Sequence, residues 1–227
     1  METWFPLVFL AFVAAVVAIG VLSHHARIRR QRELMALAHA HGLDFAIDDP
    51  FGTLGEPFTL FAKGDGRGVE NVLWGTWQGL DVRAFDHWYY EESTDSNGRS
   101  SRSYSRFSCA LVPVDAACPR LAIAEENVLT RLADALAFHD LRFESEEFNR
   151  RFTVRSDDER FASALVDARM MAWLLHHGEG YAFEVIGNRV LCWTRRVSPA
   201  SVVHLLGTTK GFRGQIPDVV RSLYPNG

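Results

Sequence analysis

Lysine, cysteine and the short signatures of catalysis are scarce in this sequence of 227 residues. Two lysines stand against 22 arginines. We attribute that bias to genomic base composition, and it weakens any argument from a single arginine to bidentate chemistry. Three cysteines without regular spacing (Cys109, Cys118 and Cys192) give no disulfide framework and indicate free thiols in a reducing compartment. The net charge of −4 offers no positive excess for coating nucleic acid.

Motifs that would identify a metal or nucleotide site are also missing. The chain has no HExxH and no GxSxG. The glycine-rich pieces 64–68 and 207–211 lack the spacing of a phosphate-binding loop. Histidines occur in pairs (24–25, 39 with 41, 176–177), but adjacent histidines on a helix point about 100° apart and do not converge on one ion. We therefore expect neither a metal nor a cofactor.

What the sequence does contain is one long uncharged run, from Trp4 to Leu22. As a helix it spans just under the roughly 30 Å of a bilayer's hydrocarbon core, and it has no polar face. A cleaved signal peptide is the alternative, but it would need positive residues before the run, and only Met-Glu-Thr precedes it. No cysteine follows for lipid attachment. A retained membrane anchor is the better interpretation.

The positive charge lies directly after this run, at Arg27, Arg29, Arg30 and Arg32. Positive residues beside a membrane helix stay on the cytoplasmic side. The sequence therefore predicts a single-pass protein of the cell membrane with its N-terminus outside. The arginines would lie at the level of the lipid headgroups, where each could gain about 1 kcal/mol from an anionic leaflet.

These features divide the chain into a transmembrane anchor (1–22), a basic juxtamembrane helix (23–43) and a cytoplasmic domain (44–227). Residues 58–126 are rich in valine and aromatics, with strands expected at 68–79, 80–90, 106–114 and 119–124. The first two are joined at Gln78-Gly79, and the polar insert 92–106 is expected to be a long hairpin loop. A helix capped by Asn127, a helix from Asp157 or Asp158 to about His176 and a hairpin turned at Gly187-Asn188 follow. Two final helices end the chain, the first opened by Ser198-Pro199. Hairpins without regular βαβ units predict an α+β fold: a mostly antiparallel sheet with packed helices. A division into sub-lobes 58–126 and 141–227 stays open.

An aromatic cluster at 74–90 has the most unusual local composition. Alternate residues of a strand point to opposite faces, so one set belongs to the core and the other could form an exposed patch for a partner. The neighbouring loop, with Arg99, Arg102 and Arg106, could reach phosphates or anionic lipid, although a solvated loop is the simpler account. The candidate interaction residues are Trp74, Trp77, Trp88, Arg99 and Arg102.

Carboxylates gather at 144–147 and 157–159. A buried, pKa-shifted pair could perform acid–base chemistry. Because these carboxylates stand among arginines, salt-bridged surface and helix capping are the simpler account.

The stretch from Glu144 to Leu175, with its ESEEFNRRF and MMAWLL pieces, resembles uncharacterised bacterial membrane-anchored proteins of a domain-of-unknown-function type. The NVLWGTWQG and VRAFDHWY hairpin is similar to the same group. This resemblance implies a membrane-tethered α+β domain and no catalytic residues.

Three functions follow from the sequence. The first is a non-enzymatic interaction or scaffold module at the membrane, with the lipid bilayer or another membrane or cell-envelope protein as partner. The second is a hydrolase-like enzyme using carboxylates between Glu144 and Glu159. The third is a lipid or small-ligand sensor with an aromatic-lined cavity.

Overall fold

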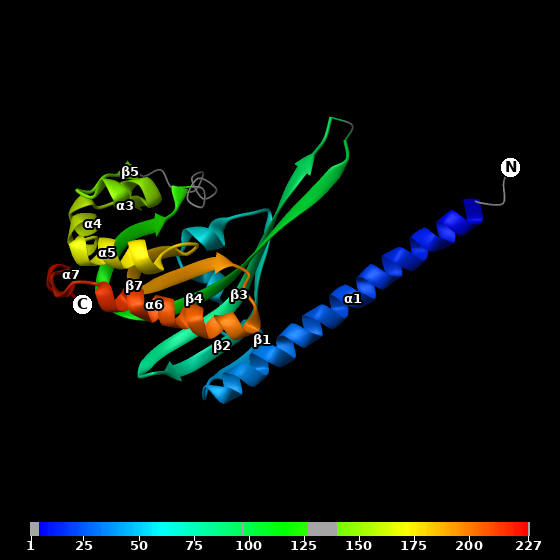
Figure 1. The fold of residues 1–227 in the computed structure, drawn as a ribbon, viewed down its shortest axis with the longest axis horizontal. Helices are drawn as coiled ribbons and strands as arrows, with labels where there is room; N and C mark the ends of the chain where they lie inside the picture. The colour runs from blue at the N-terminus through cyan, green and yellow to red at the C-terminus, as the bar shows by residue number, and fades with distance from the viewer. Residues whose placement is uncertain (1–4, 97, 127–139, 227) are drawn as a thin grey trace.

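The computed structural model describes residues 5–96, 98–126 and 140–226. It shows a long N-terminal helix, α1 (Phe5–Ala40), standing out from an α+β domain (Figure 1). Among the described helices, α1 alone is long and apolar enough to cross a membrane, and its apolar stretch is not buried against the domain. The α+β class, the apolar helix and the antiparallel sheet predicted from the sequence are confirmed.

The described strands form one seven-stranded antiparallel sheet around β4. Along one side β4 pairs first with β3 and then with β6; β7 follows it along the other. The β2–β3 turn at Gln78-Gly79 has positive φ at both residues, as a two-residue hairpin turn requires. The strands are β1 (Asp44–Asp48), β2 (Gly66–Trp77), β3 (Leu80–Thr94), β4 (Ser100–Ala124), β5 (Asp140–Leu141), β6 (Thr153–Ser156) and β7 (Ala182–Arg195).

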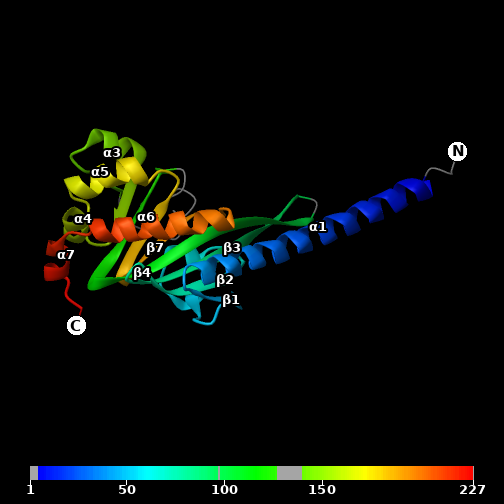
Figure 2. The same cartoon turned by 60° about the horizontal axis from the view of Figure 1, so that its bottom comes forward.

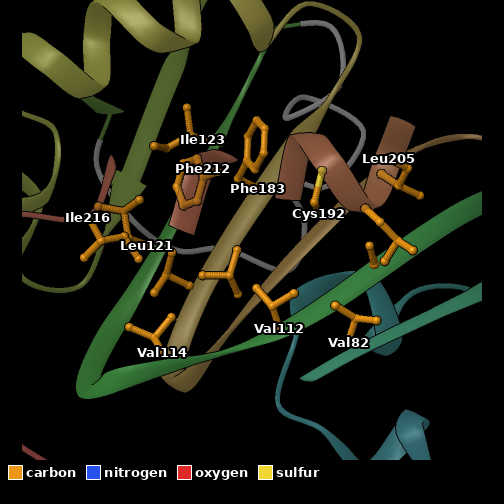
Figure 3. Close-up of a cluster of buried hydrophobic side chains, with 14 of the residues drawn as sticks. Val82, Val112, Val114, Leu121, Ile123, Phe183, Cys192, Leu205, Phe212 and Ile216 are labelled. Carbon is orange, nitrogen blue, oxygen red and sulfur yellow. The ribbon is translucent and has the colours of Figure 1, made fainter. Parts of the chain in front are cut away.

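Helices cover one face of the sheet and a loop segment covers the other. The loop segment contains η1 (Thr53–Gly55) and η2 (Thr59–Ala62). On the helical face, valines and leucines of β3, β4 and β7 pack against α6, and Phe183 stacks on Phe212 at 4.4 Å (Figure 3). The covering helices are α3 (Glu146–Arg151), α4 (Glu159–Leu165), α5 (Ala168–His177), η4 (Pro199–Ser201) with α6 (Val202–Gln215), α7 (Asp218–Leu223) and the last turns of α1.

The helical core joins parts that the sequence places in separate regions. Leu34 and Ala38 of α1 are buried in it, so the domain's core begins before residue 44. β6 and β7, from beyond residue 141, pair with β4, so the segments 58–126 and 141–227 share one sheet. All three cysteines are free and buried, and burial raises the pKa of Cys118 to about 12.

Four local predictions were wrong. The polar insert 92–106 is not a long loop: its ends extend β3 and β4 into a two-stranded ribbon that is paired as far as Thr94 and Ser100. The hairpin at Gly187-Asn188 is one strand, β7, which bends at Gly187 (φ +56°) to follow β4. The two strands expected within 106–124 are the single strand β4.

The fourth concerns the helix expected from Asp158 to His176. It is two helices, because Asp158 caps α4 and Asp167 caps α5. The helix predicted after Asn127 lies outside the described residues.

Candidate functional site: a basic groove beside the membrane helix

A groove of about 910 Å³ opens between α1 and the sheet, just past the apolar part of the helix. Its walls come from α1, β2, β3, β4 and the chain after β7, which are far apart in sequence. The lining residues are Ser23, His24, Ala26, Arg27, Arg30, Glu70, Trp88, Tyr104, Arg106, Arg196, Val197 and Ser198. The groove thus brings together four residues singled out in the sequence: Arg27, Arg30, Trp88 and Arg106.

Arg30 fastens α1 to the floor of the groove. Its guanidinium forms two hydrogen bonds to the Asp86 carboxylate, from Nε to Oδ2 at 2.7 Å and from Nη2 to Oδ1 at 2.6 Å, and Nη1 donates to the Val197 carbonyl at 2.7 Å. The two side chains are only 10% and 6% exposed. Arg30 is therefore a buried structural anchor and does not reach lipid headgroups as the sequence suggested.

Asp86 is the centre of a buried polar network. It accepts hydrogen bonds from Asn71 Nδ2 at 2.9 Å and from Ser108 Oγ at 3.3 Å, and Arg196 Nη2 lies 3.5 Å from its carboxylate. Asn71 (φ +56°) reaches it from an irregularity in β2, a backbone conformation that asparagine tolerates. The pKa of Arg196 is lowered, chiefly because the side chain is partly buried. The positive charges of Arg30 and Arg106 lower it further, while the negative charge of Asp86 opposes this shift. The network thus concentrates positive charge around one carboxylate.

The other arginines of α1 point elsewhere. Arg27 lies at the mouth of the groove, 2.9 Å from Glu70 on β2. Arg29 pairs with Glu33 one helical turn away, and Arg32 is exposed. Of the four topology residues, two therefore bind the domain and two face outward.

The sheet side of the groove carries aromatic side chains. Trp88 lies beside Tyr90 and Tyr104, with ring centroids 6.4 and 6.2 Å apart. Arg102 lies over the Tyr90 ring and Arg106 over the Tyr104 ring. Exposed cation–π contacts of this kind are worth about 0.5–1 kcal/mol.

The glycine-rich piece 64–68 makes room for these rings. A Cβ on Gly68 would lie 2.7 Å from the Trp88 ring, and one on Gly66 would lie 2.3 Å from Tyr90. The glycines mark a place where aromatic rings lie over the strand.

The other candidate interaction residues lie outside the groove. Trp77 is buried in the helical core. Trp74 packs edge-on against Phe51 beside a separate hollow of about 350 Å³. Arg99 and Arg102 are exposed on the ribbon. Trp74 and Trp88 therefore line two separate hollows, and Trp77 packs in the core.

The carboxylates proposed for catalysis are spread over the surface. Glu144, Glu146, Glu147, Asp157 and Glu159 are all exposed. The exception, Asp158, accepts the Phe161 N–H as a helix cap and bonds Tyr224 Oη at 3.0 Å, and the first of these contacts lowers its pKa. This arrangement provides no pocket for acid–base chemistry.

Two buried titratable groups lie on the other face of the sheet. Glu184 accepts hydrogen bonds from the backbone N–H and hydroxyl of Thr59, and lies 3.5 Å from Arg120. Burial outweighs these contacts and raises the pKa of Glu184 to about 7. His87 lies among Phe61, Tyr89 and Phe107, and burial lowers its pKa to about 4.

The groove's chemistry is that of an anion-binding surface. The two serines of the groove are not hydrogen-bonded to His24: the Ser23 hydroxyl donates to the Gly20 carbonyl, and the Ser198 hydroxyl bonds the Ser201 hydroxyl. No group of three or more metal-binding side chains occurs in the described ranges. Guanidinium donors beside aromatic rings suit a phosphate or carboxylate.

Sequence reasoning named Arg106 with the polar loop but missed Asp86, Arg196 and Glu70. Asp86 had a signal: it shares a strand face with Val82 and Ala84, and a carboxylate on a core-facing position needs a buried cation. Which arginine supplies that cation depends on the tertiary fold.

Comparison with known proteins yields a likeness of fold. No protein-family model and no curated protein matches the chain. Among solved structures, the mycobacterial trehalose monomycolate transport factor A, TtfA, matches with a TM-score of 0.58 and 15% sequence identity. The match covers 87% of this chain and 97% of that one. At this identity the likeness concerns the fold.

Proposed function

We propose that this chain is a membrane-tethered, non-enzymatic module that assists transport at the cell membrane by binding another envelope protein or the membrane surface. The observation that carries the proposal is the junction of α1 with the domain. One uninterrupted helix holds both the apolar segment and the Arg30 anchor, so the sheet is held close to the bilayer. The likeness to a transport factor supports the same class of role.

The orientation belongs to the proposal. We place the N-terminus outside and the domain in the cytoplasm, because four arginines follow the apolar segment. Pairing of Arg27 and Arg30 in the folded domain does not weaken this argument, since topology is set while the chain is inserted. The resemblance of residues 144–175 to uncharacterised membrane-anchored proteins is part of the same proposal.

A reporter fused after Gly227 tests the orientation. We expect alkaline phosphatase to be inactive and a fluorescent protein that folds only in the cytoplasm to be active. Activity of the phosphatase fusion would contradict the orientation. Replacing Arg29 and Arg32 with glutamate should weaken the preference for a cytoplasmic domain, and it removes no buried contact because both side chains are exposed.

In-cell photocrosslinking tests the interaction role. A photoreactive amino acid at Tyr104, on the ribbon near the membrane, should capture a reproducible envelope protein or lipid. The matched control is Ser163, which is exposed on α4 at the far side of the domain. Equal yields at the two positions, together with measurable turnover of a small molecule by the purified chain, would favour the enzyme alternative.

A further inference from the structure

The basic groove has more positive charge than its own carboxylates balance. Four guanidinium groups line it, from Arg27, Arg30, Arg106 and Arg196, and one carboxylate, Glu70, lies among them. Asp86 beneath the floor adds a second negative charge. The formal excess is therefore about two positive charges in a half-enclosed space, where screening by water is reduced.

Two of these arginines donate hydrogen bonds to carboxylates, and the other two donate none to a carboxylate of the described residues. Arg30 is bound to Asp86 and Val197 O, and Arg27 is paired with Glu70. Arg106 has no carboxylate within ion-pair distance in the described chain and lies over the Tyr104 ring. Arg196 shares the Asp86 carboxylate, 3.5 Å from its Nη2, with Arg30, and its buried Nε has no hydrogen-bond partner among the described residues.

The fold brings Arg106 and Arg196 together. The chain after β7 runs beside β4, and the Arg196 N–H donates to the Arg106 carbonyl at 3.1 Å. Both side chains line the groove with Trp88 and Tyr104. An anion placed there would receive donors from two arginines and contact an aromatic wall.

The groove lies at headgroup depth. Ser23, His24 and Arg27 follow Leu22, the end of the apolar run, and extend about 8 Å further along the helix. The polar region on each side of a bilayer is about 5–8 Å thick. The ribbon also projects from the same side of the domain as the apolar part of α1 (Figures 1 and 2).

We propose that this groove binds the phosphate of an anionic phospholipid headgroup from the adjacent leaflet, with Arg106 and Arg196 as the donors and Trp88 and Tyr104 as the flanking surface. The inference rests on membrane attachment from the proposed function. It does not depend on the orientation, which decides only the leaflet.

The test measures which lipids the full chain retains. The protein is incorporated into nanodiscs of phosphatidylcholine with one-quarter phosphatidylglycerol, released into detergent and examined by native mass spectrometry. We expect one retained phosphatidylglycerol per chain, well above its share of the bilayer. Arg106→Gln should lower that retention about tenfold, because a charge-assisted hydrogen bond is lost.

Arg102→Gln is the matched control. Arg102 lies four residues away on the same strand, is exposed and also covers a tyrosine ring, but it does not line the groove. It should leave retention unchanged. An equal loss in both variants would indicate general surface attraction and overturn the proposal, as would a wild-type chain that does not prefer phosphatidylglycerol.

Competition with inorganic phosphate distinguishes a site for the phosphate of a lipid headgroup from a site for free phosphate. Phosphate at 10 mM should displace little of the retained lipid. If phosphate stabilises the full chain through Arg106 while phosphatidylglycerol is not retained, the site serves free phosphate and the lipid proposal is wrong. These readouts use inserted protein, so a failure of the orientation or of the partner experiment is seen separately.

Discussion

Arg30 shows how one residue of a basic cluster can have a different role from its neighbours. The sequence presents four arginines after an apolar run, and all four have the same interpretation there. In the structure Arg30 is buried against Asp86, whereas Arg29, one position earlier, faces outward with Glu33. Helical periodicity shows that their side chains point about 100° apart, but it does not show which of them meets a carboxylate.

Replacing Arg30 with methionine should lower the free energy of unfolding by about 3–5 kcal/mol, because Asp86 then remains buried without its main partner. Denaturant unfolding of the full chain in detergent micelles measures the change. Arg29→Met is the control, and we expect it to stay within about 0.5 kcal/mol of the wild type. Similar losses in the two variants would contradict a special role for the Arg30 contact.

The buried pair of titratable groups, Glu184 and His87, predicts opposing pH effects. The folded-state pKa of Glu184 is raised from 4.5 to about 7, so its contribution to stability is present below pH 4.5 and is lost as the pH rises to 7. The folded-state pKa of His87 is lowered from 6.5 to about 4, so its contribution is present above pH 6.5 and is lost as the pH falls to 4. Between pH 4.5 and 6.5 the two effects cancel.

Single substitutions should separate these effects. Glu184→Gln should make stability rise from pH 4.5 to 6.5, and His87→Phe should make it fall over the same range, each by up to about 3 kcal/mol relative to the wild-type profile. Chemical unfolding at half-unit pH intervals measures the slopes. Profiles parallel to the wild type in both variants would show that neither pKa is shifted in the folded chain.

At the scale of elements, the sequence located apolar segments well and polar ones poorly. The apolar helix, the Gln78-Gly79 hairpin and the helix starting after Ser198-Pro199 were predicted because their signals are local: an uncharged run, a turn dipeptide and a proline at the first helical position. The ribbon was missed because its outer residues are polar on both faces and pair only with each other. β7 was misread because its bend at Gly187 has the local chemistry of a turn.

Because the outer ribbon contributes nothing to the core, it should be removable. Replacing residues 93–101 with Asn-Gly, which joins the Glu92 and Arg102 pair by a type I′ turn, should change the free energy of unfolding by less than about 1 kcal/mol. Every described residue of that stretch is exposed. Urea unfolding of the full chain measures the effect, and a loss of several kcal/mol would show an unrecognised packing role.

At the scale of the whole molecule, α1 joins the membrane segment to the domain without a break. Its 36 residues correspond to about 54 Å. The last turns are fixed by Leu34, Ala38 and Arg30, so the apolar half is held at a set angle to the sheet. The sequence predicted both helical segments, the second continuing from the first, and set a boundary at residue 22 because their compositions differ.

Spin labels at Ala14→Cys and Ser163→Cys should report this continuity. The native thiols are buried, so the two introduced cysteines are labelled selectively. We expect a narrow distance distribution in nanodiscs. One alanine inserted after Ser23 should shift the mean and keep the width, whereas Gly-Gly at the same place should broaden the distribution. Equal breadth in all three chains would contradict a continuous rigid helix.

A long helix that is attached rigidly to a domain transmits its own tilt to that domain. A transmembrane helix accommodates a thinner or thicker bilayer partly by changing its tilt. Because α1 is one uninterrupted helix from the apolar segment to the Arg30 anchor, a change of its tilt turns the sheet and its ribbon with it. The height of the ribbon tip above the lipid is thereby tied to the thickness of the membrane that holds the chain.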